Sequence, residues 1–176
     1  MEGPVRSIFA ALLSGAAALS CTQTVVVPPA APPMNVSMTP VHRGADGMVI
    51  AHVPLSGWGT GPAALPPGAQ MVVLEGNPAE AGLFTVRLKF PNNYTIAPHY
   101  HGSWEHITVI SGVFHLGMGA TFNTNGWNEL RAGSFAAMPT GMRHFAHTVG
   151  ETVVQLHGMG PWVVTYVNRG DDPRNR

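Results

Sequence analysis

The sequence predicts an all-β domain that closes into a small antiparallel barrel or sandwich. From about Val41 onward it contains no apolar pattern of about ten or more residues that is typical of a helix. Short alternating apolar runs recur instead between Gly, Pro and Asn turns, which indicates strands. With 45% apolar residues, a chain of 176 residues can bury one core, so we expect one folded domain.

The strand pattern recurs along the whole body of the chain. In Leu83–Phe90 the even positions are apolar and the odd positions are mostly polar, so one face should be buried. The segment Asn123–Leu130 is rich in Asn and Gly and is expected to be a loop, in which Trp127 either closes the barrel mouth or only anchors the loop. The expected strands are Met48–Val53, Met71–Glu75, Leu83–Phe90, Trp104–Ile110, Val113–Met118, Ser134–Met138, Phe145–Val149, Thr152–His157 and Trp162–Val167.

Residues 1–21 resemble an export signal rather than a part of the domain. Arg6 precedes the apolar stretch Ile8–Leu19, which is too short to span a bilayer as a helix. The alternative of an N-terminal core helix is disfavoured by the small residues and prolines that follow. Cys21 stands where a lipoprotein carries its lipidated cysteine, but ordinary cleavage after Ser20 competes with that interpretation. We therefore expect an exported protein, either periplasmic or lipid-anchored at the cell envelope.

The composition of the rest of the chain separates a linker from the folded domain and argues against nucleic-acid partners. Residues 22–40 are rich in proline and predict an extended linker, so the folded domain is expected to span residues 41–176. Cys21 is the single cysteine, so the domain has no disulfide. Nine basic and nine acidic residues balance, and only 10% of residues are charged, which disfavours nucleic-acid binding.

Histidines and a glutamate cluster in one short run. His99, His101 and Glu105 stand at even intervals, so along an extended backbone all three side chains can project from one face. Three such groups on an inward face are costly to bury unless a cation pairs with them. Imidazole and carboxylate suit Zn, Fe, Mn, Ni, Co or Cu, so the run predicts one divalent transition metal.

Parity also decides between two adjacent candidate ligands. Ile107 and Val109 continue the face of Glu105 and are apolar, so that face should look into the barrel. His106 and Thr108 should then look outward. Glu105 is therefore the preferred ligand, and a fourth ligand must come from elsewhere in the chain.

A second run supplies that ligand, and together the two runs resemble the cupin family. His144 follows a strand and a Pro-Thr-Gly turn, as the histidine of the second cupin motif does. Asn93 replaces the glycine that begins motif one, and Asn tolerates left-handed backbone. Thr148 replaces the asparagine that ends motif two. The positions that match the two motifs in register are His99, His101, Glu105, Gly112, Gly133, Pro139, Gly141 and His144.

The resemblance implies a jelly-roll-like antiparallel barrel, the double-stranded β-helix of cupins. It also implies a metal site made of His99, His101, Glu105 and His144. The sequence around these residues also resembles that of exported bacterial cupin-domain proteins. Cupin-like barrels commonly pair by their sheet edges, so a homodimer is expected by analogy. No spacing relates the remaining histidines to the site; these include His42, His52, His115 and His147.

Gln155 and His157 alternate on the strand that follows the second motif. They share one face, which is either exposed to solvent or part of a polar pocket. In the second case both would line the substrate pocket, and His157 would act as an acid or base near the metal.

Three functions fit this site. Four protein ligands on a six-coordinate metal leave two positions open, which suits a dioxygenase-like enzyme for a small organic substrate, with Glu105 as a base. A non-redox isomerase or lyase would use the metal as a Lewis acid. Arg6 has no arginine neighbour, so the chain is expected to cross the membrane unfolded and to meet Zn or Cu outside the cytoplasm, which favours this second function. A small-molecule or metal-binding module without turnover is the third.

Overall fold

A computed structural model describes residues 41–43, 47–52 and 57–176. The predicted signal segment 1–21, with Cys21, and the predicted linker 22–40 lie outside the described residues and stay predictions. Within the described ranges, no helix has the length and apolar character needed to cross a membrane.

The described chain is built of antiparallel strands, which confirms the all-β prediction. β1 and β2 form a two-stranded sheet, and the other strands form a nine-stranded sheet. Two short 3-10 helices follow, η1 (Arg169–Asp171) and η2 (Pro173–Asn175). The strands are β1 (Val41–Arg43), β2 (Val49–Ala51), β3 (Gly59–Thr60), β4 (Gln70–Glu75), β5 (Gly82–Phe90), β6 (Thr95–Tyr100), β7 (Glu105–Met118), β8 (Asn128–Arg131), β9 (Phe135–Met138), β10 (His144–Gly160) and β11 (Thr165–Tyr166).

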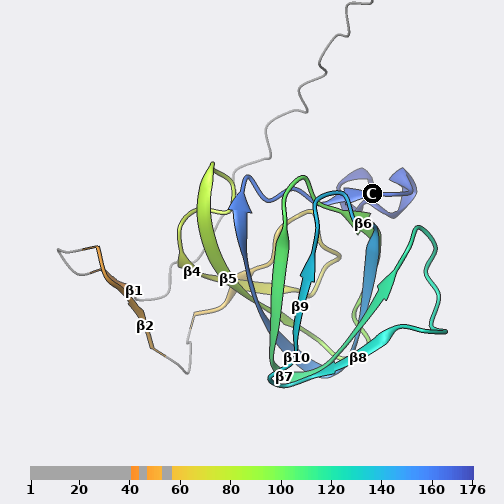
Figure 1. The fold of residues 1–176 in the computed structure, drawn as a ribbon, viewed down its shortest axis with the longest axis horizontal. Helices are drawn as coiled ribbons and strands as arrows, with labels where there is room; N and C mark the ends of the chain where they lie inside the picture. The colour runs from red at the N-terminus through yellow and green to blue at the C-terminus, as the bar shows by residue number, and fades with distance from the viewer. Residues whose placement is uncertain (1–40, 44–46, 53–56) are drawn as a thin grey trace, which may run out of the picture. The chain divides into compact units, whose positions relative to one another are not determined.

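The long strands β7 and β10 form the spine of the fold. They pair antiparallel from the His144–Met118 end to the Gly158–Glu105 end, and Figure 1 shows them running side by side. One end of this pair is flanked by β6 and β8, and the other end by β5 and β9. The two halves of the sheet therefore share this strand pair, and the apolar core lies on their inner face.

The sequence predicted two shorter strands in place of β7 and two in place of β10, and the structure has one long, bent strand at each of these places. Gly112 lies at the bend of β7 with φ of 80°, and a Cβ there would meet the backbone and side chain of Thr152. Pairing continues through the bend, with Ser111 opposite Val153, across an irregularity in register. The glycine thus bends the strand at a bulge instead of ending it.

Among the strands that were missed in the sequence, β6 and β8 pair with the long strands β10 and β7; the short β1 and β3 were missed as well. β6 carries His99 but also contains Pro98 and has no clear alternation, so it was not predicted. β8 lies partly in the segment that was predicted as a loop. Both segments are strands because their backbones pair with β10 and β7, respectively, and such long-range pairing leaves little trace in local composition.

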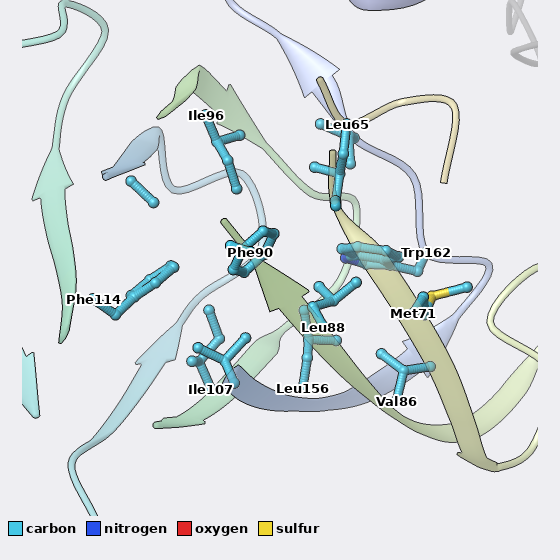
Figure 2. Packing of buried hydrophobic residues seen from close by; sticks show 14 of the residues in the cluster. Leu65, Met71, Val86, Leu88, Phe90, Ile96, Ile107, Phe114, Leu156 and Trp162 are labelled. Carbon is cyan, nitrogen blue, oxygen red and sulfur yellow. The ribbon is translucent and has the colours of Figure 1, made fainter. Parts of the chain in front are cut away.

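The alternation in β5 is confirmed. Phe84, Val86, Leu88 and Phe90 are each at most 2% exposed and belong to the main core, and Figure 2 shows three of them among the packed side chains. The rings of Phe90 and Phe114 lie 6.2 Å apart. This face of β5 therefore fixes one wall of the barrel interior.

The two departures from the cupin motifs both have a structural account. Asn93 has φ of 58°, which confirms that it takes the left-handed backbone of the glycine it replaces. Thr148 is 1% exposed, donates its hydroxyl to the carbonyl of Pro91 at 2.7 Å, and accepts from the Tyr94 N–H at 3.0 Å. Thr148 therefore ties β10 to the turn that precedes β6.

Loss of these two hydrogen bonds of the Thr148 hydroxyl should destabilise the fold. Thr148→Val keeps the shape of the side chain but leaves the Pro91 carbonyl and the Tyr94 N–H without their partner, which should lower the free energy of unfolding by ~1–3 kcal/mol. Urea unfolding measures the change. Thr108→Val, on the outer face of β7, is the control and should change stability by less than about 0.5 kcal/mol. Equal losses in both variants would contradict this role of Thr148.

Candidate metal centre

The fold brings His99, His101, Glu105 and His144 together. His99 lies near the end of β6 and pairs across the sheet with His144, the first residue of β10. His101 follows β6, and Glu105 begins β7. All four side chains are buried, none more than 4% exposed. Residues from two separate stretches therefore converge, as the motifs predicted.

The three imidazole rings lie close to one another. Ring centroids are 5.1 Å apart for His99 and His101, 4.3 Å for His99 and His144, and 5.3 Å for His101 and His144. One nitrogen from each ring can be chosen so that all three lie within 4.8 Å of one another. This spacing is compatible with three nitrogen ligands around a single ion.

Hydrogen bonds to the backbone fix how the rings are turned. In each ring Nδ1 lies 2.8–2.9 Å from a carbonyl oxygen. Because a carbonyl oxygen only accepts, Nδ1 carries a proton, which in a neutral imidazole leaves Nε2 with a bare lone pair. The carbonyls belong to Ala97 for His99, Val163 for His101 and Met142 for His144.

Glu105 faces two of these lone pairs. Its Oε1 lies 3.3 Å from Nε2 of His101, and its Oε2 lies 3.4 Å from Nε2 of His144. Within the described residues, the buried Nε2 of His101 has no hydrogen-bond partner. A lone pair next to a buried carboxylate is unfavourable unless something positive lies between them. The residues present therefore fit a cation.

The pKa shifts favour the forms that bind a metal. Burial lowers the pKa of His99 to about 3, helped by the nearby His144 and His101, and burial also lowers the pKa of His101. Burial alone would raise the pKa of Glu105, but the imidazoles of His101 and His144 outweigh it and hold that pKa at about 2. At neutral pH His99 and His101 are thus neutral and Glu105 is a carboxylate, as metal ligands must be.

Trp162 supports the cluster and was not found from the sequence. Its indole Nε1–H donates to Oε1 of Glu105 at 3.2 Å, and its ring stacks on His101 with centroids 5.7 Å apart at 22°. In the sequence, Trp162 was predicted only as the first residue of a strand. A buried indole needs an acceptor, but no spacing in the sequence says which one.

A small apolar cavity adjoins the cluster. It has a volume of about 20 Å³, which is room for about one water-sized molecule. His99, Glu105 and His144 line one part of it, and Trp162 lines another. The other described side chains that line it are all apolar: Leu65, Leu88, Phe90, Ile96, Ile107, Phe114, Leu116, Ala146, Val154 and Leu156.

Comparison with known proteins agrees with this architecture. No protein-family model matches the chain, and no curated protein matches it in sequence. A protein assigned as ethanolamine utilization protein Q (EutQ) from Salmonella typhimurium is similar in structure, with a TM-score of 0.57 over 69% of this chain and 93% of that chain, at 14% identity. The described chain shares the fold of that protein. At such identity the likeness concerns the fold alone.

Two further solved structures overlap with part of the chain. An RmlC-like cupin from Shewanella frigidimarina has 20% identity and a TM-score of 0.45, and the match covers 52% of this chain and 76% of that one. The polyketide cyclase RemF from Streptomyces resistomycificus has 19% identity and a TM-score of 0.49, and the match covers 60% of this chain and 75% of that one.

Gln155 and His157 lie away from the cluster. On β10 their neighbours Val154 and Leu156 point into the core and line the cavity, so strand alternation directs Gln155 and His157 to the outer face of the barrel. Gln155 accepts from Nε of Arg87 at 3.1 Å, and His157 stacks on His106, with ring centroids 4.9 Å apart. Their placement corresponds to the outward alternative and gives no support to a role in a pocket.

Trp127 does not close the mouth of the barrel. It stacks on His115, with centroids 4.3 Å apart, and lies 5.6 Å from the ring of His147. His115 is flanked on β7 by the core residues Phe114 and Leu116, so this contact lies on the outer face. The structure corresponds to the loop-anchoring alternative for Trp127.

The buried histidines predict an acid-sensitive metal-free protein. The pKa of His99 is about 3 in the folded chain and 6.5 in the unfolded chain. Below pH 6.5 the unfolded chain therefore binds a proton at His99 that the folded chain does not bind. Folding stability is therefore intact above pH 6.5 and falls as the pH drops toward 3. We expect a loss of roughly 1 kcal/mol per pH unit from His99, with a further loss from His101, whose pKa burial also lowers; urea unfolding after chelator treatment measures it.

His99→Gln should reduce this slope, since it removes one of the titrating groups. The control is His52→Gln, at an exposed position, which should leave the slope unchanged. A stability that does not fall between pH 6.5 and pH 5 in the metal-free wild type would contradict the assignment of these buried, neutral imidazoles.

Proposed function

We propose that the chain binds one divalent transition metal through His99, His101, Glu105 and His144. The observation that carries this proposal is the convergence of Nε2 lone pairs and a carboxylate in a buried site, with Nε2 of His101 lacking a hydrogen-bond partner among the described residues. Nitrogen and oxygen donors without sulfur suit Zn, Fe, Mn, Ni, Co or Cu. A bound cation would give all four groups a partner.

Metal content tests this ligand set. The wild-type protein should hold about one metal ion per chain, and the double variant His101→Ala with Glu105→Ala should hold less than about a tenth of that, because two of the four ligands are gone. Elemental analysis of purified protein measures both. His106→Ala is the matched control, since His106 neighbours Glu105 but lies on the opposite face, and it should retain its metal. Wild-type metal content in the double variant would refute the assignment.

For the reaction, we infer a metal-dependent, dioxygenase-like enzyme that acts on a small organic substrate. Four protein ligands on a six-coordinate ion leave two positions free, and the metal, when bound, would supply the redox chemistry there. The adjoining cavity is apolar and has room for about one water-sized molecule, which is the size and environment that suit dioxygen.

The chain's own groups have separate parts in this proposal. The imidazoles are held by their Nδ1 hydrogen bonds and keep the donor atoms in place. The carboxylate of Glu105 lines the cavity and, once released from the metal, would be the group that takes a proton from the substrate; the indole of Trp162 donates to its Oε1. The apolar walls exclude water from the reaction.

The second candidate is a non-redox isomerase or lyase. It is favoured by the signal-like residues 1–21, with Arg6 lacking an arginine neighbour, which support export of an unfolded chain. Outside the cytoplasm Zn or Cu would compete best for the site, and Zn would polarise a carbonyl or enolate oxygen without redox chemistry. We accordingly propose an exported protein, soluble in the periplasm or tethered through a lipidated Cys21, and a homodimer remains a proposal by analogy.

Oxygen uptake separates these candidates. Purified protein loaded with Fe(II) should consume oxygen with a suitable enediol or phenol at least about tenfold faster than the His101→Ala, Glu105→Ala variant, because the reaction requires the bound metal. An oxygen electrode measures the rate, and elemental analysis of the protein as isolated identifies its metal. A protein isolated with Zn alone, with no uptake in any loaded form, would contradict the oxygenase and leave the Lewis-acid enzyme or a binding module.

A further inference from the structure

Leu65 lies between the cavity at the cluster and a second pocket at the surface. The second pocket has a volume of about 250 Å³ and is lined by residues of the loop 60–69 and by Pro173. The inner cavity has a volume of about 20 Å³ and is lined by His99, Glu105 and His144 among others. Among the described residues, Leu65 is the one side chain that lines both. It therefore forms the partition between the surface pocket and the candidate metal ligands.

The loop that carries Leu65 is held by few hydrogen bonds. The Leu65 N–H donates to the carbonyl of Pro62 at 2.9 Å, within the loop itself. The carbonyls on either side of Leu65 accept from two tyrosine hydroxyls, those of Tyr166 to Ala64 at 2.8 Å and of Tyr94 to Pro66. Burial raises the pKa of Tyr94 and raises the pKa of Tyr166 to about 12, so both hydroxyls keep their protons and donate at neutral pH.

The other leucines of the inner cavity are placed differently. Leu88, Leu116 and Leu156 lie on β5, β7 and β10, where strand pairing on both sides fixes their backbones. Leu65 is 5% exposed and belongs to the same core, and Figure 2 shows it near Trp162 and Leu88, reaching in from a loop. Displacing Leu65 therefore breaks a few loop contacts, whereas displacing any of the strand leucines would disrupt the sheet.

We propose that Leu65 is the gate and the specificity-determining residue of this site, and that the substrate is a small organic molecule with an uncharged, largely apolar body that enters through the surface pocket. This inference rests on the proposed function. The inner cavity holds about one water-sized molecule, so a carbon substrate reaches the ligands only when a residue of its wall moves aside. Leu65 is the described wall residue that also lines the surface pocket. The apolar body then lies where Leu65 lay, and the polar end of the substrate meets the cluster.

The chemistry of the lining supports this substrate class. The surface pocket is lined by Thr60, Gly61, Ala63 and Leu65 with several prolines, and the described residues around it include no charged side chain. In the inner cavity Glu105 is the one charged group among the described lining residues, and no Lys or Arg is present there to pair with an anion. A phosphate or a second carboxylate on the substrate would be left without a partner, so substrates rich in negative charge are disfavoured.

Quenching of Trp162 fluorescence by acrylamide tests the gate in the metal-free, full-length protein. Trp162 lines the inner cavity, and the other tryptophans are removed as Trp58→Phe, Trp104→Phe and Trp127→Phe. In this background Leu65→Ala should raise the quenching constant at least about threefold, because acrylamide, a small uncharged organic molecule, then passes from the surface pocket to Trp162. Tyr166→Phe, which frees the Ala64 carbonyl, should raise it as well.

Leu88→Ala is the matched control. It enlarges the inner cavity by the same side-chain atoms but does not line the surface pocket, so its quenching constant should stay within about 1.5-fold of the background protein. Leu65→Phe should lower quenching. If Leu65→Ala impairs folding, Leu65→Val provides the smaller truncation, with the same direction expected. Equal quenching in the Leu65 and Leu88 variants, or no change in either, would overturn the gate.

The outcome of this experiment does not depend on whether the proposed function is correct. Quenching needs no metal and no turnover, so a positive result stands even if metal analysis of the wild type finds no metal. A protein that binds its metal but whose Leu65 variants quench like the background would retain the metal centre and lose the gate. Once a substrate is known, Leu65→Ala should shift the ratio of kcat/KM values toward bulkier substrates by about tenfold.

Discussion

The site depends on three hydrogen bonds between imidazole Nδ1–H groups and backbone carbonyls. Because each carbonyl can only accept, it fixes the proton on Nδ1 and points the lone pair of Nε2 into the barrel. The carboxylate of Glu105 then lies against two of these lone pairs in a buried place, which leaves negative and electron-rich atoms facing each other. A cation between these atoms would relieve that contact, so the orientation of the rings, more than their presence, indicates a metal centre.

The shared strands β7 and β10 explain why distant residues meet. β10 begins at His144 and pairs there with β6, which delivers His99, while the far end of β10 lies opposite Glu105 at the start of β7. The bend at Gly112 folds the two halves of the sheet over a common core, so both ends of the pair contribute to one cavity. The ligand set and the fold are therefore two consequences of the same strand pairing.

Sequence patterns predicted what depends on alternation and failed where long-range pairing decides. The inward direction of Glu105 and the outward direction of His106 follow from strand parity, and the structure buries the first and leaves the second half-exposed. Parity also placed Gln155 and His157 on one face, but whether that face lies inside depends on the neighbours Val154 and Leu156, which the sheet packs inward. Trp162 and Leu65 were not found because their contacts with Glu105 and the cavity join segments far apart in the chain.

The size of the inner cavity constrains how this site can work. A buried site with room for about one water-sized molecule protects its ligands from bulk solvent, but it admits nothing larger in this conformation. Access must therefore come from movement of the wall, and the paired strands that form most of that wall are the parts least able to move. The loop with Leu65 is held by two tyrosine hydroxyls, a turn at Pro62 and one backbone hydrogen bond between Gly61 and Ala69, so it is less firmly held than the paired strands. The rigid barrel holds the ligands, and movement of the loop with Leu65 would let an organic substrate enter the closed site.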